Sequence, residues 1–330
     1  MIILCLLFAG CSSGSPKEYV TDFFAMDTIM SITAYGKGAE DGAGAAARRI
    51  VELERLLSVT DVNSEIYALD HGGNAVVSPE TADLISFALE VAESTGGALE
   101  PTIYPVLSAW GFTADNNRVP SAEEISELLK KVDHKRVSID GNTVTLGEGM
   151  MLDLGAVAKG YAGDEAERIM RENGVESALI YLGGNIQLLG KKPDGGEWRL
   201  GIKDPAGAGN VGILSASDCA VVTSGNYERS FTADDGTVYG HIIDPESGIP
   251  VNNGLLSVTI VAKEGRMCDA LSTALFVMGS DGAQEYWRAN GNFDMILITD
   301  DGELFITDGI SDSFELDSAH TELSVKIVYK

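Results

Sequence analysis

Apolar residues recur along this chain with two different spacings, and each spacing predicts a different kind of element. Helical spacing marks five segments: residues 45–57, 79–95, 121–132, 159–173 and 269–278. Ser78-Pro79 and Ser121 are typical helix N-terminal residues, and Gly96 and Gly174 are typical of the residue that follows a helix end. The sequence therefore predicts five helices with defined ends.

Short runs of β-branched and aromatic residues predict strands between these helices. They cover residues 23–35, 137–139, 143–146, 178–182, 198–202, 220–223, 256–262, 294–299 and 303–306. Asp140-Gly141-Asn142 and Asp300-Asp301-Gly302 predict hairpin turns, each joining two of these runs. Helices and hairpins are mixed without an internal repeat, so we expect an α+β (mixed α/β) fold, built as one unit of two intimately joined lobes.

The charge of the chain limits what it can bind. Of its 330 residues, 23 are Lys or Arg and 50 are Asp or Glu, which gives a formal net charge of −27. A protein this acidic repels a nucleic-acid backbone, so we expect no nucleic-acid partner. A phosphorylated small ligand would need local help from a metal ion, backbone N–H groups or a single well-placed lysine.

The N-terminus has the features of a bacterial lipoprotein. Residues 1–10 are almost entirely apolar, too short to span a bilayer but suited to a signal-peptide core. Phe8-Ala9-Gly10-Cys11 resembles a lipobox. We therefore expect residues 1–10 to be a lipoprotein signal peptide, Cys11 to be lipidated, residues 11–19 to be a tether and residues 20–330 to be the folded domain. The protein would then be anchored to a membrane of the bacterial cell envelope, on its extracytoplasmic side.

Two apparent nucleotide motifs lack the context that their chemistry requires. Gly207-Ala-Gly-Asn-Val-Gly212 matches GxGxxG, but Asp204-Pro205 precedes it and residues 213–222 after it have the composition of a strand, so we expect a loop. Gly184 to Lys191 has the wrong spacing for a P-loop. The four histidines form no HExxH motif, and no CxxC pair is present; Cys219 and Cys268 are expected to be buried free thiols.

Three segments carry candidate chemistry, and each has a structural alternative. Asp153 and Lys159 flank a predicted strand-to-helix turn, where they could bind a phosphorylated ligand or simply cap and solvate the helix. Asp269 and Thr273 are one helical turn apart, which suits Mg²⁺, although Asp269 could be an N-cap and Thr273 could bond its own backbone. His241 at a strand edge is either a proton shuttle or a structural histidine.

Seven ordered motifs then resemble those of one family. They are Met26-Asp-Thr, Gly97-Ala-Leu-Glu-Pro-Thr with Trp110-Gly-Phe, Asp153-Leu-Gly-Ala-Val-Ala-Lys-Gly-Tyr, Leu182-Gly-Gly-Asn, Thr223-Ser-Gly-Asn-Tyr-Glu-Arg, His241-Ile-Ile-Asp-Pro and Asp269-Ala-Leu-Ser-Thr-Ala-Leu-Phe. In this order they resemble the FAD:protein FMN transferases, the ApbE-like flavin transferases, over roughly residues 20–310.

The resemblance implies an activity and a partner. Members of this family bind FAD and Mg²⁺ in the cell envelope, break the pyrophosphate, attach FMN through a phosphoester to a Thr or Ser of a partner protein and release AMP. The expected acceptor is a flavoprotein subunit of the redox-pump type.

The resemblance also assigns residues. Asp269, Thr273 and the carbonyl of Ala156 are the implied metal ligands, and His241 is the candidate base for the acceptor hydroxyl. The implied FAD contacts are Met26, Ala98, Leu99, Glu100, Asp153, Lys159 and Ile243.

One position departs from the family pattern and keeps alternatives open. Thr60 stands where the family often has an aromatic residue that could stack on a ring and exclude water. The chain could therefore be an Mg²⁺-dependent FAD pyrophosphatase that yields FMN and AMP. A non-enzymatic FAD-binding lipoprotein is a third reading, although the Asp269–Thr273 pair argues against it.

Overall fold

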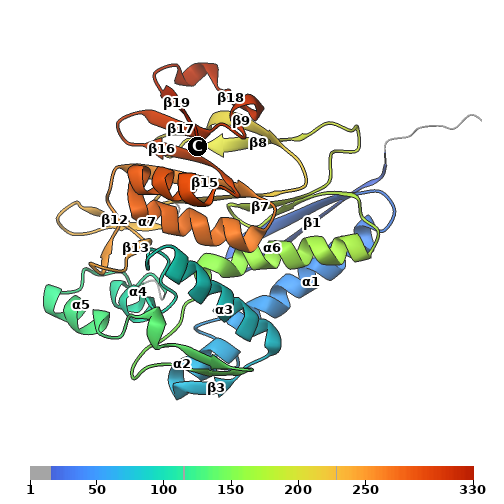
Figure 1. The fold of residues 1–330 in the computed structure, drawn as a ribbon. Helices are drawn as coiled ribbons and strands as arrows, with labels where there is room; N and C mark the ends of the chain where they lie inside the picture. The colour runs from blue at the N-terminus through green and yellow to red at the C-terminus, as the bar shows by residue number, and fades with distance from the viewer. Residues whose placement is uncertain (1–15, 114–115, 228) are drawn as a thin grey trace, which may run out of the picture.

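A nine-stranded sheet forms the centre of the molecule (Figure 1). The computed structural model describes residues 16–113, 116–227 and 229–330, so the expected signal peptide, Cys11 and the first part of the tether lie outside the described residues. In sheet order the strands are β1 (Glu18–Ala25), β2 (Thr28–Tyr35), β6 (Ser177–Tyr181), β7 (Asn185–Leu189), β10 (Ala220–Gly225), β15 (Leu255–Ala262), β16 (Asp294–Thr299), β17 (Glu303–Thr307) and β19 (Ser324–Val328). Neighbours are antiparallel except for the parallel pair β17–β19.

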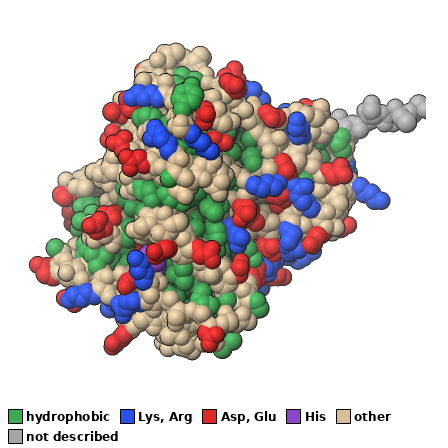
Figure 2. All heavy atoms as spheres, in the orientation of Figure 1, with side chains coloured by type: hydrophobic (Ala, Val, Ile, Leu, Met, Phe, Trp, Pro, Cys, Tyr) green, Lys and Arg blue, Asp and Glu red, His purple; other side chains and the backbone are tan. Residues whose placement is uncertain are grey.

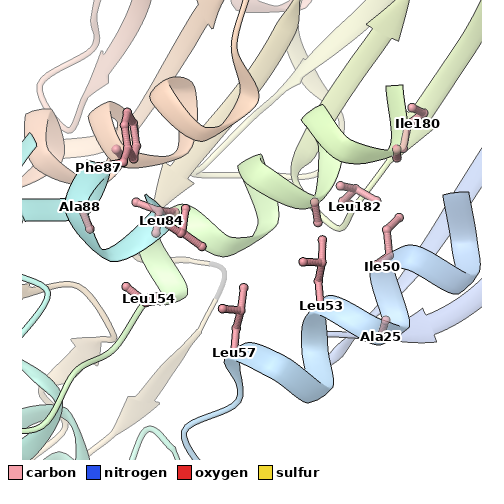
Figure 3. Packing of buried hydrophobic residues seen from close by; sticks show 14 of the residues in the cluster. Ala25, Ile50, Leu53, Leu57, Leu84, Phe87, Ala88, Leu154, Ile180 and Leu182 are labelled. Atoms are coloured by element: carbon pink, nitrogen blue, oxygen red, sulfur yellow. The ribbon is translucent and has the colours of Figure 1, made fainter. Parts of the chain in front are cut away.

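Three long helices, α1 (Ala39–Leu57), α6 (Gly155–Glu172) and α7 (Gly265–Asn290), cover one face of this sheet (Figure 1). Their apolar stripes pack on the sheet because burial removes that surface from water. Figure 3 shows Ile50, Leu53 and Leu57 of α1 in one buried cluster with Ile180 and Leu182. This cluster forms the floor of the functional site described below.

A small three-stranded sheet packs on the opposite face of the large one. It consists of β8 (Trp198–Lys203), β9 (Asn210–Ala216) and β18 (Phe314–Leu316). Strand β8 alternates between buried and exposed residues, as expected for a sheet with one face on a core. Trp198 and Leu200 enter a cluster with Val261 and Ile296 of the large sheet.

The remaining elements lie beyond the helices and beside the end of the large sheet (Figure 1). They are α2 (Glu65–Gly72), β3 (Asn74–Val76), α3 (Pro79–Ser94), α4 (Tyr104–Trp110), α5 (Ala122–Leu129), β4 (Ser138–Asp140), β5 (Thr143–Thr145), β11 (Ser230–Thr232), β12 (Val238–Gly240), β13 (Ile243–Asp244) and β14 (Ile249–Pro250). Short 3₁₀ helices cover His134–Arg136, Ser311–Ser313 and Ser318–His320. No helix in the described part of the chain is long and apolar enough to cross a membrane.

The α+β class is confirmed, and several predicted elements hold with their caps. The side chains of Ser78 and Ser121 accept the N–H of Thr81 and Glu124, as capping residues do. The hairpins β4–β5 and β16–β17 are present. The GxGxxG segment is a loop that runs into β9, with no helix after it, so it lacks the context of a dinucleotide site.

Other boundaries were wrong, and the errors have physical causes. Helices α1, α6 and α7 begin at Ala39, Gly155 and Gly265, ahead of the expected 45, 159 and 269, because a single first turn is too short to show an amphipathic period. The α7 element also continues past a kink at Gly279. The expected strand 23–35 is two strands joined by a two-residue turn. Cys219 is only partly buried, whereas Cys268 is buried, and both are free thiols.

Candidate functional site

A pocket of about 580 Å³ brings together nearly all the residues selected from the sequence. It opens where the N-terminal turn of α6, the C-terminal end of α1, the β1–β2 turn and the loops around β11 to β13 meet. Ten of the selected residues line it: Met26, Ala98, Leu99, Glu100, Asp153, Ala156, Lys159, His241, Ile243 and Thr273. Segments separated by more than 200 residues in the sequence thus form one site.

The start of α6 supplies one wall of the pocket. Asp153 Oδ1 accepts the N–H of Gly155, the first residue of α6, at 2.5 Å, and Asp153 also lines the pocket. Burial raises the pKa of the Asp153 carboxyl, while the Gly155 hydrogen bond and the charge of Arg229 lower it. The first turn of an 18-residue helix carries a partial positive charge. This wall therefore favours an anionic ligand.

Asp70 lies behind this wall and supports it through a hydrogen bond. Its Oδ1 accepts the N–H of Leu152 at 2.8 Å, directly before Asp153. Burial raises the pKa of the Asp70 carboxyl to about 7. The segment that carries Asp153 into the pocket is thus held by a buried acid.

Asp269 lies immediately behind the pocket wall. It is within α7, four residues after the helix begins, so the N-cap interpretation is wrong. Its Oδ2 accepts the N–H of Gly160 at 2.8 Å, and the residue is 5% exposed. Burial raises the pKa of its carboxyl, and the nearby charge of Lys159 lowers it. An acid this buried needs a cation or hydrogen bonds to stay ionised.

The expected metal ligands are all oxygen donors. Thr273 is one turn after Asp269 and lines the pocket, as does Ala156. Thr273 Oγ1 is 3.5 Å from Ser224 Oγ, which also lies 2.8 Å from Ser272 Oγ. No group of three or more His, Cys, Asp or Glu side chains within the described ranges could hold a metal. One carboxylate with a hydroxyl and a carbonyl is a hard-oxygen set that fits Mg²⁺ and suits zinc poorly.

His241 has a defined tautomer. Both its backbone N and its Nδ1 lie near the carbonyl oxygen of Arg229, at 3.1 and 3.2 Å. A carbonyl only accepts hydrogen bonds, so Nδ1 carries the proton and Nε2 keeps its lone pair. Burial lowers the His241 pKa to about 4, and the charges of Arg229 and Lys159 act in the same direction. The ring is therefore a neutral proton acceptor near pH 7.

Glu100 lines the pocket, but its carboxylate is hydrogen-bonded to Thr102 and His134. One carboxylate oxygen accepts from Thr102 N and Oγ1 at 2.9 and 2.6 Å. The other lies 3.1 Å from His134 N and 2.8 Å from His134 Nδ1. The carboxylate thus fixes the loop that presents Ala98 and Leu99 to the pocket.

Sequence reasoning missed the groups that hold the tip of the β1–β2 hairpin. Met26 and Asp27 have φ values of 46° and 63°, left-handed conformations that non-glycine residues rarely adopt. Glu54 Oε1 accepts the N–H of Met26 at 2.7 Å, and Arg229 forms an ion pair with Asp27 at 3.3 Å. Strain held in this way by neighbours is typical of functional sites. The Met26 assignment itself was the only signal in the sequence.

Thr60 occupies the place that the sequence pattern gave it. It lines the pocket, is exposed, and its N–H donates to Ser58 Oγ at 3.2 Å. No aromatic ring covers this side of the pocket at position 60, which leaves it open to water.

Comparison with known proteins agrees with this fold. The ApbE family model matches residues 26–297. The FAD:protein FMN transferase of Treponema pallidum is 33% identical over 339 residues, with 94% of this chain and 93% of that protein covered. The one from Escherichia coli is 31% identical over 330 residues, with 93% of each covered.

Solved structures give the same result. The ApbE protein of Thermotoga maritima superposes with a TM-score of 0.85 at 33% identity, covering 90% of this chain and 99% of that one. The flavin transferase ApbE from Vibrio cholerae has a TM-score of 0.78 at 26% identity, covering 94% and 100%. The architecture is thus that of the flavin transferase class. The chain belongs to the ApbE family of FAD:protein FMN transferases.

Proposed function

We propose that this protein cleaves FAD with the help of Mg²⁺, attaches FMN by a phosphoester bond to a Thr or Ser of a partner protein, and releases AMP. The observation that carries the proposal is the pocket itself. It places a neutral histidine with a free Nε2 beside Lys159, Thr273 and a helix N-terminus, which are the groups that phosphoryl transfer to a hydroxyl requires.

The proposed reaction is one displacement at phosphorus. The acceptor hydroxyl oxygen forms a bond to the FMN-side phosphorus, and the bond from that phosphorus to the bridging oxygen breaks. AMP departs with the bridging oxygen. The hydroxyl proton passes to His241 Nε2, which is free because Nδ1–H is engaged with the Arg229 carbonyl.

Asp269, Thr273 and the Ala156 carbonyl would hold the metal. When bound, Mg²⁺ supplies positive charge to the pyrophosphate oxygens. The protein's own contribution is to keep Asp269 in place through Gly160 N–H and to bring Lys159 within reach of the same phosphates. Such charge compensation matters more here than in most proteins, since the chain carries a net charge of −27.

Hydrolysis of FAD to FMN and AMP is the second candidate. It uses the same groups, with water in place of the acceptor hydroxyl. The exposed Thr60 on the pocket rim favours it, because no ring excludes water there. Transfer remains the first proposal, since the relatives carry the name of the transferase.

One experiment separates these functions. The lipid-free protein is incubated with FAD and Mg²⁺, with and without an acceptor flavoprotein domain of the redox-pump type. Flavin fluorescence on the denatured acceptor supports transfer, whereas FMN and AMP formed without acceptor support hydrolysis. Intact FAD in both samples would indicate that the protein binds FAD without catalysing transfer or hydrolysis.

The Asp269→Ala variant tests the metal assignment. Removing the only acidic ligand should abolish both reactions, a loss of at least about a thousandfold. Asp281→Ala, an exposed acid later in α7, is the matched control and should keep full activity. Turnover by Asp269→Ala at the wild-type rate would sink the metal assignment.

We also propose that Cys11 carries a lipid that anchors the protein to a cell-envelope membrane, where the acceptor would be met. The lipobox-like Phe8-Ala9-Gly10-Cys11 supports this. Mass spectrometry of the native N-terminal peptide tests it, with Cys11→Ser as control. A Cys11 peptide without lipid, or membrane attachment of Cys11→Ser equal to wild type, would contradict it.

A further inference from the structure

The pocket contains few positive charges for a site that faces a pyrophosphate. In the described part of its lining, Lys159 and Arg229 are the lysine and arginine side chains. Lys159 extends from α6, whereas Arg229 lies between β10 and β11. FAD brings two negative charges between its two halves. A single lysine plus one metal ion leaves the second phosphate without a protein cation.

Arg229 is placed to serve that second phosphate. Its side chain is 50% exposed and pairs with Asp27, which is 78% exposed, at 3.3 Å. Arg229 lines the pocket together with Asp153 and His241, and its carbonyl oxygen lies 3.2 Å from His241 Nδ1. Arg229 therefore stands at the same end of the pocket as the proposed base.

The ion pair with Asp27 is easily exchanged. An exposed pair at this distance contributes little, because water and salt screen both charges. A phosphate offers the guanidinium two parallel hydrogen bonds in a less exposed position, which is a stronger contact. Exchange of Asp27 for a phosphate therefore favours ligand binding.

We propose that Arg229 binds the FAD pyrophosphate directly, together with Lys159, and leaves Asp27 when FAD enters. This deepens the proposed function and rests on it. It also gives the Arg229 backbone and side chain separate tasks. The carbonyl sets the His241 tautomer. The guanidinium binds FAD, and His241 acts as the base for the attack on the FAD phosphorus.

The test compares FAD with riboflavin, which lacks phosphate, in the absence of acceptor. Arg229→Gln should raise the Kd for FAD by about tenfold or more and change that for riboflavin by less than about twofold. Arg229→Lys should lose less, since it keeps the charge. Each variant keeps the backbone carbonyl, so the His241 contact is conserved.

Asp27→Asn is the matched control for a purely structural role. If Arg229 only clamps the hairpin tip, removing its partner should weaken FAD binding as much as Arg229→Gln does. If Arg229 binds phosphate, Asp27→Asn should bind FAD as tightly as wild type or more tightly. Equal losses for FAD and riboflavin in Arg229→Gln would overturn the proposal.

A measurement on the wild type does not depend on how the variants fold. Phenylglyoxal modification of Arg229, followed by mass spectrometry, should be slowed by FAD and by inorganic pyrophosphate but not by riboflavin. Unchanged modification in saturating FAD would contradict the assignment. If wild type binds FAD no better than riboflavin, the proposed function itself fails; if it prefers FAD and Arg229→Gln shows the same preference, only Arg229 is wrongly assigned.

Discussion

His241 shows how backbone geometry sets the chemistry of one residue. Its Nδ1–H donates to the Arg229 carbonyl, and burial holds its pKa at about 4. A base whose pKa lies below its usual value stays neutral at lower pH. The histidine therefore loses its function only as the pH falls through about 4, rather than through about 6.5 for an ordinary histidine.

The pH dependence of FMN transfer tests this directly. The contribution of His241 to kcat/KM for FAD should be level from pH 7 to pH 5 and fall about tenfold per pH unit below about 4. Arg229 and Lys159 are the charged groups that act on the ring. His71→Gln, which changes an exposed histidine, should keep the same acid limb, whereas His241→Gln should be nearly inactive. An acid limb centred near pH 6.5 would show that His241 is not buried and neutral.

Residue assignments divide into those that sequence could predict and those that depend on distant partners. Asp153, Lys159, Asp269 and Thr273 were selected from spacing and resemblance, and three of them line the pocket with Asp269 just behind. Glu54 has the sequence signal of a solvated helix residue, yet it holds the hairpin tip. Its role depends on the packing of α1 beside β1, which no local pattern encodes.

At the scale of elements, the closest approach of α6 and α7 positions Asp269. A Cβ at Gly160 would lie 2.2 Å from the Gly265 carbonyl oxygen and 2.7 Å from the Asp269 Cβ. Both helices therefore need glycine at the crossing. The same contact allows Gly160 N–H to reach the Asp269 carboxylate. Packing and the proposed metal site are thus one feature of the fold.

Gly160→Ala should separate the helices and displace Asp269. We expect a loss of stability of about 2–3 kcal/mol from overpacking, with a larger loss of activity than of fold. Gly163→Ala is the matched control, since it lies in the same helix and its Cβ would have ordinary contacts at 3.5 Å. Thermal unfolding and FMN transfer are measured on both variants. Equal effects in the two would contradict the crossing argument.

Element types were easier to predict than element boundaries. Amphipathic spacing located the five predicted helices, but the glycine- and alanine-rich first turns of α1 and α6 gave no periodic signal. The β1–β2 turn was missed because Met26-Asp27 is not a usual turn sequence. Glu54 and Arg229 hold that turn from outside the hairpin, so tertiary contacts override local preference here.

At the scale of the whole molecule, the sequence predicted the class but not the strand order. β2 pairs with β6 and β7 with β10, and long segments of chain separate the members of each pair. Strand pairing of this kind is decided by which faces bury together, and a one-residue shift would expose a core face. Local patterns therefore establish α+β, and only the assembled sheet brings residues 26, 153, 241 and 273 to one pocket.

The net charge makes a different prediction about the whole molecule. Acidic and basic side chains are interspersed over the face shown in Figure 2, and the formal net charge of the chain is −27. Such a surface repels dianionic FAD at long range, whereas Lys159 and Arg229 attract it only within the pocket. Salt shortens the Debye length from about 30 Å at 0.01 M to about 10 Å at 0.1 M.

The association rate of FAD should therefore rise with salt. Between 10 and 100 mM NaCl, at fixed low Mg²⁺, we expect a severalfold increase measured by stopped-flow flavin fluorescence. Riboflavin is uncharged and serves as the control, and its rate should not change. A FAD rate that falls with salt would mean that the field of Lys159 and Arg229 extends past the pocket mouth and dominates the approach. The attraction by the pocket would then raise the association rate of FAD more than the repulsion by the net charge lowers it.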